Sequence, residues 1–155
     1  MKAALRAELV EVLAAALATA RAAHAAASEG AFHEEARAEN PKDTRGLEQS
    51  YLARGIAQRV AELETAVAEV GALALRAFGP RAVVAMSALV TVDEAGTAAR
   101  FFVAPHGGGT VLRGGVQVVT PSSPLGRALL GKAVDDDVEL AVPGRARSFS
   151  ISAIA

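Results

Sequence analysis

Residues 118–140 read VVTPSSPLGRALLGKAVDDDVEL, and the middle of this stretch carries the start and stop signals of a short helix. Ser123 can cap the helix N-terminus, because its hydroxyl can accept a hydrogen bond from a free backbone N–H group. Pro124 suits the first helical position and Gly131 suits the C-terminal cap. The stretch therefore predicts a short helix that directly follows a strand at residues 116–120.

Runs rich in β-branched residues lie on both sides of this helix. Strands are predicted at residues 83–92, 98–104, 116–120, 138–142 and 148–154. Residues 93–96 and 143–144 have the composition of tight hairpin turns. We therefore expect an α+β domain at residues 79–155, with a five-stranded, mostly antiparallel sheet that packs on the helix and buries Leu125, Leu129 and Leu130.

The composition changes near residue 79, since the chain has one proline and four glycines before it and five prolines and ten glycines from there on. Upstream, apolar residues repeat with the spacing of a coiled-coil seam. The predicted seam positions are Leu52, Ile56, Val60, Leu63, Val67 and Val70 in one helix, and Leu5, Leu9, Val12, Ala16, Thr19, Ala23 and Ala26 in the other. Asn40-Pro41 interrupts the helical pattern between them. Residues 1–78 are therefore predicted to form an antiparallel helical hairpin.

The overall composition excludes several classes of protein. The chain has 155 residues, no cysteine, no tryptophan and a net charge of −1. It therefore has no disulfide, thiolate zinc site or iron–sulfur cluster. Its near-zero net charge argues against non-specific duplex binding, which needs a basic face, and leaves a local basic patch open. The longest apolar run near the N-terminus, residues 12–20, is too short to cross a bilayer. We expect a cytoplasmic protein without a membrane partner and without sequence-specific DNA binding.

Other residues that could carry chemistry lack the necessary context. His24, His33 and His106 do not have the spacing of metal ligands and are predicted to be ordinary surface residues. The Gly107–Gly109 triplet is not followed by the Lys-Ser/Thr pair of a phosphate loop and is predicted to be a flexible loop. Ser123 has no nucleophile-elbow context, so helix capping is its predicted role.

Acidic residues gather around the predicted hairpin turn at residues 34–46. They are Glu34, Glu35, Glu39 and Asp43, and they alternate with Arg37, Lys42 and Arg45. One interpretation is a solvated turn whose charges pair with each other. The other is that carboxylates at the end of a thin rod enter a narrow cavity and bind a hard cation such as Mg²⁺.

The stretch at residues 118–140, followed by Pro143-Gly144 and a final strand, resembles the C-terminal signature of the Gre-family transcript cleavage factors of bacterial RNA polymerase. The resemblance implies an FKBP-like C-terminal domain that docks at the rim of the polymerase secondary channel, while an N-terminal coiled coil reaches down the channel. It also implies that the partner-binding residues are Ser123, Pro124, Leu125, Gly126, Arg127 and Lys132.

The resemblance is looser at the hairpin tip. Gre factors carry Asp-x-x-Glu-Asn there, and the two carboxylates are held to bind the second catalytic Mg²⁺ and to orient a water molecule. Here the aligned residues run from Asp43 to Leu47, so the Asp is present and Gly46 replaces the Glu. One carboxylate binds a metal less tightly than two. Glu39 could substitute for the missing carboxylate, because it lies across the predicted turn.

The implied site therefore consists of Asp43 and Glu39 as catalytic carboxylates, with Glu35 as a further ligand of a Mg²⁺ ion that the polymerase shares. On this interpretation the protein is not itself an enzyme, has no cofactor of its own and contacts nascent RNA only indirectly. Either it stimulates cleavage of backtracked RNA, or it regulates initiation or elongation without cleavage.

A different class of function is an FKBP-like protein-binding module, unrelated to transcription, whose coiled coil dimerises. Prolyl isomerase activity is not expected of such a module. The C-terminal half offers only Phe101, Phe102 and Phe149 to line an apolar proline pocket.

Overall fold

The computed structural model describes residues 1–37 and 45–155, with side chains described for residues 1–30 and 46–155. Packing divides the chain into two compact units, one of Met1–Val10 with Glu69–Ala155 and the other of Glu11–Ala68. The domain boundary at residue 79 was inferred from composition and stays a prediction. Among the helices of the described residues, none combines the length and the apolar composition that a membrane span requires.

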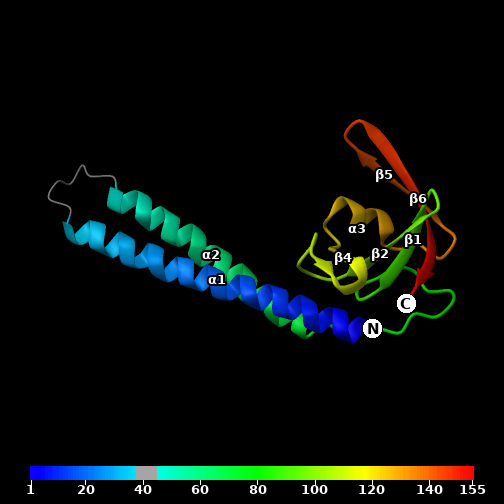
Figure 1. The fold of residues 1–155 in the computed structure, drawn as a ribbon, viewed down its shortest axis with the longest axis horizontal. Coiled ribbons are helices and arrows are strands. Elements are labelled where there is room, and N and C mark those ends of the chain that lie inside the picture. The colour runs from blue at the N-terminus through cyan, green and yellow to red at the C-terminus, as the bar shows by residue number, and fades with distance from the viewer. Residues whose placement is uncertain (38–44) are drawn as a thin grey trace. The chain divides into compact units, whose positions relative to one another are not determined.

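Two long helices form the N-terminal part of the chain, as predicted. Helix α1 covers Lys2–Arg37 and helix α2 covers Arg45–Gly71. They run side by side in Figure 1, and an ion pair between Arg21 and Glu64, with 3.0 Å between Nη2 and Oε1, joins them. At 1.5 Å per residue, the 27 residues of α2 extend over about 40 Å.

The buried stripes of the two helices differ in part from the predicted seams. Predicted seam positions that are exposed are Val12, Thr19, Ala23, Ala26 and Leu52. On α1 the buried leucines are Leu5, Leu9, Leu13 and Leu17, which follow each other at four-residue steps. The prediction assumed a strict seven-residue repeat. Because an α-helix has 3.6 residues per turn, the positions that face the neighbouring helix shift gradually along the sequence. The largest apolar side chains near these positions are the ones that become buried.

Leu63 and Leu52 test the observed seam. The Leu63 side chain is 3% exposed and that of Leu52 is 52% exposed. Leu63→Ala should lower the free energy of unfolding by about 2–4 kcal/mol, because it removes buried methyl groups and leaves a cavity. Leu52→Ala should cost less than about 1 kcal/mol. Urea unfolding followed by circular dichroism measures both, and equal losses would contradict the observed seam.

The C-terminal part contains six strands and one helix of more than one turn. The strands are β1 (Leu89–Glu94), β2 (Thr97–Val103), β3 (Val111–Leu112), β4 (Val116–Val119), β5 (Asp137–Val142) and β6 (Arg145–Ile154), and the helix is α3 (Pro124–Leu129). They form a single sheet in the order β3-β4-β2-β1-β6-β5 (Figure 1). All pairs are antiparallel except β2 with β4. The predicted α+β fold is confirmed.

The sheet differs from the prediction at two places. Residues 83–88 do not continue β1. Val83 forms an isolated antiparallel bridge with Ala133, and residues 85–88 form a turn in which Ser87 has a φ of 70° and Ala88 N–H donates to the Ala85 carbonyl. Ser87 is fully buried, and its hydroxyl accepts a hydrogen bond of 2.9 Å from Arg76 N–H. The sixth strand, β3, has only two residues, too few to give a periodic signal in the sequence.

Both predicted hairpin turns are present. Ala95 and Gly96 form a two-residue loop between β1 and β2, and both have positive φ. The Asp93 carboxylate accepts a hydrogen bond from Gly96 N–H at 3.0 Å. Pro143 and Gly144 form the loop between β5 and β6, with a φ of 84° at the glycine. Each turn needs a residue that tolerates this backbone conformation, which the sequence supplies.

One hydrophobic core supports the sheet and α3. Its buried residues are Val84, Ala88, Val90, Val92, Phe101, Val103, Val119, Leu129, Val138, Phe149 and Ile151. Leu129 is fully buried, while Leu125 and Leu130 are partly buried against the same core. The predicted burial of the α3 leucines is therefore confirmed, with Leu129 at the centre.

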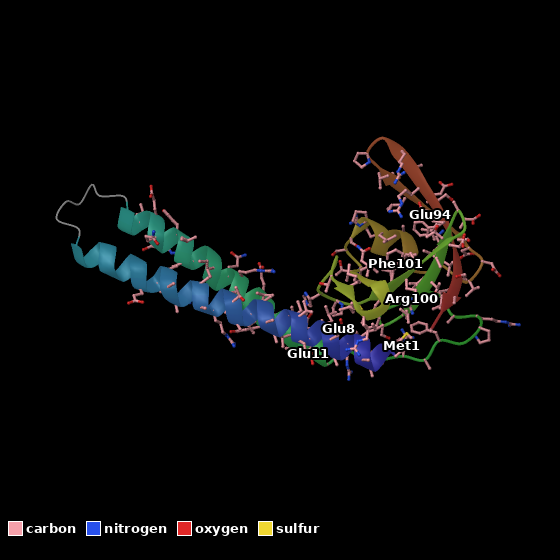
Figure 2. The ribbon with its side chains drawn as sticks, in the orientation of Figure 1. Met1, Glu8, Glu11, Glu94, Arg100 and Phe101 are labelled. Carbon is pink, nitrogen blue, oxygen red and sulfur yellow. The ribbon has the colours of Figure 1, made fainter. Side chains whose placement is uncertain are left out.

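The first turns of α1 belong to the same compact unit as this sheet. Leu9 is fully buried, and its Cδ1 atom lies 2.7 Å from the place where a Cβ atom at Gly107 would be. Glu8, labelled in Figure 2, accepts hydrogen bonds from Arg113 Nε at 2.6 Å and from Arg113 backbone N–H at 3.0 Å. The side-chain hydrogen bond from Arg113 is the main cause that lowers the pKa of Glu8 below its ordinary value.

The lowered pKa of Glu8 predicts a pH-dependent contribution to stability. Because the folded-state pKa lies below the ordinary value of 4.5, the contribution is present above that pH and disappears as the pH falls through the folded-state pKa. Glu8→Gln should therefore be less stable than the wild type at pH 7, and this difference should be smaller at pH 3. Urea midpoints at the two pH values measure this, and an unchanged difference would contradict it.

Candidate functional site

Several hydrogen bonds hold the start of helix α3 against the end of β4. The Ser123 hydroxyl accepts a hydrogen bond from Gly126 N–H at 3.0 Å and donates one to the Thr120 carbonyl at 2.8 Å. Pro124 occupies the first turn, where a missing N–H costs nothing. The predicted N-cap is confirmed, and it fixes the direction in which α3 leaves the sheet.

Gly126 allows α3 to approach the backbone of Thr120. A Cβ atom at residue 126 would lie 1.8 Å from the Thr120 carbonyl oxygen, which is far inside van der Waals contact. The helix ends at Leu129 with Leu130 as its C-cap, and the next residue, Gly131, has a φ of 80°. Both glycines of this segment are therefore required by backbone geometry, one for space and one for conformation.

A cavity of about 630 Å³ opens beside the N-terminus of α3. Residues 117–119 of β4 and the following residues 120 and 122–125 form one side of it, with Gly108 and Gly109. Residues 140–143, from the end of β5 and its turn, line it as well. Its wall is mainly apolar, with hydroxyl groups from Thr120, Ser122 and Ser123 at one end. It has the size and composition of a binding pocket.

Among the described residues that line this cavity, none is aromatic. Phe101, Phe102 and Phe149 are 7%, 0% and 4% exposed and lie in the interior of the domain. Their side chains therefore pack in the core and cannot hold a proline ring in this cavity. The cavity lacks the aromatic wall that the sequence analysis required for a prolyl isomerase.

The residues predicted to bind a partner divide into two groups. Ser123, Pro124 and Leu125 line the cavity, whereas Gly126, Arg127 and Lys132 do not. Arg127 Nη1 donates to the Ser122 carbonyl at 2.8 Å, and the Lys132 carbonyl accepts from Val84 N–H at 2.8 Å. These two contacts brace the segment around α3. Whether the six residues bind a partner stays a prediction.

The other side of the cavity comes from residues that carried no functional signal in the sequence. Leu140, Ala141 and Val142 join the site because the β5–β6 hairpin brings them opposite the start of α3. The Pro143-Gly144 turn predicted the hairpin itself, but nothing in the sequence indicated which part of the domain the hairpin would face.

The tip carboxylates lie outside the part of the chain where side chains are described. Glu39 and Asp43 fall in residues 38–44, and Glu35 lies in α1 without a described side chain. Gly46, the residue that stands where Gre factors carry the second carboxylate, is buried near the start of α2. Among the described residues, no group of three His, Asp or Glu side chains is arranged to hold a metal ion.

Two other segments singled out by the sequence have structural roles. His106 Nε2 lies 2.5 Å from Glu69 Oε2, and the histidine side chain is 34% exposed. The glycine triplet lies in a loop, as predicted, and its flexibility stays a prediction. Gly109 N–H donates to the Val118 carbonyl at 2.9 Å, and Gly107 and Gly109 both have positive φ. These glycines meet a conformational requirement that composition alone does not show.

The close approach at Gly126 predicts a strong local effect. Gly126→Ala should lower the free energy of unfolding by about 3 kcal/mol or more, because the added methyl group must displace backbone rather than a side chain. Gly79→Ala is a matched control, since a Cβ atom there has no neighbour within 4 Å. It should change stability by less than about 0.5 kcal/mol. Urea unfolding of both variants tests the prediction, and similar values would refute it.

Comparison with known proteins identifies the class of this domain. Residues 80–155 match the family model described as "Transcription elongation factor, GreA/GreB, C-term". Residues 80–155 therefore form a GreA/GreB C-terminal domain, and the resemblance to the Gre family of transcription elongation factors noted in the sequence is confirmed. No curated protein gives a significant match.

Several solved structures are similar over most of the chain. The GreA factor homolog 1 (Gfh1) protein of Thermus thermophilus is 22% identical, with a TM-score of 0.42 and 94% of each chain covered. Gfh1 of Thermus aquaticus is 23% identical, with a TM-score of 0.43 and coverage of 93% of this chain and 92% of that chain. The GreA/GreB factor of Nitrosomonas europaea is 20% identical, with a TM-score of 0.40 and coverage of 68% and 89%.

Proposed function

We propose that this chain is a Gre-like factor that binds bacterial RNA polymerase in the cytoplasm and modulates elongation. Its C-terminal domain attaches to the polymerase and its hairpin tip enters the secondary channel. The observation that carries the proposal is the match of residues 80–155 to the GreA/GreB C-terminal family.

The cavity beside α3 is the proposed attachment site. Its walls are built from regular strands and from a helix whose first turn is fixed by the Ser123 cap. A preformed apolar cavity can bind a partner without a large loss of conformational entropy. Ser123, Pro124 and Leu125 supply the side of the cavity that the family resemblance assigns to partner binding.

The hairpin is long and thin enough to enter a narrow channel. Its buried positions include the small residues Ala27 and Ala66, with Ala53 half-buried, beside the larger Leu13, Leu17 and Leu63. Small side chains at a helix–helix interface allow the two axes to approach closely, toward the lower end of the usual 8–10 Å range. A thin rod of this kind can reach a site that a globular domain cannot enter.

The proposed role of the tip is to lend carboxylates to the active site of the polymerase. Asp43 is the principal candidate, with Glu39 and Glu35 as further ligands of the shared Mg²⁺. This ion would activate a water molecule for hydrolysis of backtracked RNA. The protein itself is then not an enzyme and needs no cofactor of its own, and it meets nascent RNA only where the polymerase holds the transcript.

Gly46 replaces the second carboxylate of the family motif, and this replacement leaves two possible forms of the proposed function. Gly46 is buried at the start of α2, so this position presents no acidic side chain. If Glu39 takes over, the factor stimulates cleavage. If it does not, the factor occupies the channel and regulates initiation or elongation without cleavage.

Polymerase binding and cleavage can be measured in one preparation. The wild-type protein should be retained by immobilised core RNA polymerase. If cleavage occurs on stalled, backtracked complexes, Asp43→Asn should slow it by about tenfold or more while leaving retention unchanged. Glu62→Gln is the matched control, because it removes an exposed carboxylate of α2 outside the tip and should change neither property.

The outcomes separate the alternatives. Absence of polymerase binding would refute the proposed function and favour a protein-binding module unrelated to transcription. Binding without Asp43-dependent shortening of the RNA would identify a non-cleaving channel regulator.

A further inference from the structure

We infer that a local basic surface, at the start of α1, binds the phosphate backbone of duplex DNA weakly and without sequence specificity. The basic surface consists of four side chains of the compact unit Met1–Val10 with Glu69–Ala155, namely Lys2, Arg6, Arg76 and Arg100. The inference goes beyond the proposed function and does not depend on polymerase binding.

Acidic residues are absent from long stretches of this unit. Residues 70–92 and 95–134 contain no Asp or Glu, while they contain five arginines and one lysine. The first ten residues contain a single acid, Glu8, beside Lys2 and Arg6. The net charge of −1 for the whole chain is therefore an average over segments of opposite sign, and a basic surface can form locally.

Three of the four cations meet where the first turns of α1 contact the segment after α2. Lys2 Nζ donates a hydrogen bond to the Arg76 carbonyl, and Arg6 Nη1 donates to the Leu73 carbonyl at 2.9 Å. The Lys2 ammonium lies 4.7 Å from the centroid of the Phe78 ring, and the Arg76 guanidinium lies 6.0 Å from it. These contacts hold the three positive charges close together.

Arg100 brings a fourth cation to the same place from β2. Its Nη1 atom lies 3.9 Å from the sulfur of Met1, and Figure 2 shows the two residues next to each other. Its Nη2 atom donates to the Gly114 carbonyl at 2.8 Å. The adjacent Arg113 is not counted in the basic surface, because it pairs with Glu8.

The four cations bond to neutral groups, so their charge is not compensated within the protein. A hydrogen bond to a carbonyl uses one N–H group of an ammonium or guanidinium and leaves the others for a ligand. Among the ion pairs between described side chains, none includes Lys2, Arg6, Arg76 or Arg100. Partial burial lowers the pKa of Lys2, and a phosphate beside it would favour the charged form again.

The form of the surface favours a duplex over a single strand. Proteins that bind single strands stack the bases on exposed aromatic rings. The ring of Phe78 has the cations of Lys2 and Arg76 over it and is not free for stacking. A duplex carries more phosphate charge per unit length than a single strand, so it gains more from contact with clustered cations. The expected ligand is therefore the backbone of duplex DNA.

Fluorescence anisotropy of a short labelled duplex with the full-length protein tests the inference. Four neutralised phosphates predict that log K falls with log salt with a slope of about −3 to −4. The Kd should therefore rise about 100-fold between about 50 mM and about 200 mM salt. Two duplexes of unrelated sequence should bind within about twofold of each other, and a single strand of the same length should bind more weakly.

Charge variants show whether the basic surface is responsible. The double variant Lys2→Gln with Arg76→Gln should reduce the steepness of the salt slope by about 2 and raise the Kd at least about tenfold at low salt. The double variant Lys2→Arg with Arg76→Lys keeps both charges and should bind within about twofold of the wild type. Arg59→Gln is the matched control, because it removes an exposed arginine of α2 outside the basic surface. Urea unfolding shows whether each variant is folded.

Three results would overturn the inference alone. They are no binding of duplex DNA at low salt, an unchanged salt slope in the folded Lys2→Gln, Arg76→Gln variant, and tighter binding of a single strand than of the duplex. Retention by immobilised core RNA polymerase is measured in parallel and should be the same for the wild type and this variant. Loss of polymerase retention in the wild type would refute the proposed function and leave the DNA inference standing.

Discussion

The C-terminal domain depends on the close contact between α3 and the end of β4. Gly126 brings the helix so near the Thr120 carbonyl that no side chain fits between them, and Ser123 bonds to both partners at the same point. This contact sets the position of Leu129 in the core and of Pro124 and Leu125 beside the cavity. One small residue thus couples the packing of the interior to the shape of the cavity.

Local signals predicted the parts of the fold that depend on neighbouring residues. The Ser123 cap, the hairpin turns at Gly96 and Gly144 and the two long helices all follow from chemistry within a few residues. The predictions that were wrong depended on long-range packing. Leu52 was placed in the seam by a heptad count, and residues 83–88 were placed in a strand by their β-branched composition. Packing against the rest of the chain determined both.

The candidate site shows the same limit. The sequence identified Ser123, Pro124 and Leu125 through a family resemblance, and these residues do line a cavity. The opposite side of the cavity, at Leu140–Pro143, depends on how the sheet curves and has no local signal. The tip carboxylates were accessible only to sequence reasoning, since Glu39 and Asp43 lie outside the described residues. The sequence thus predicted the residues on one side of the cavity and missed those on the other side.

The order of the strands has a consequence for synthesis of the protein. Strand β6 comes last among the strands but lies inside the sheet, between β1 and β5. Until the ribosome has added residues up to Ile154, the nascent chain leaves one edge of β1 and both edges of β5 unpaired. The helices need no such distant partner to begin forming. The nascent protein can therefore form its helical hairpin before its sheet, and the cavity beside α3 is completed only when β6 is inserted.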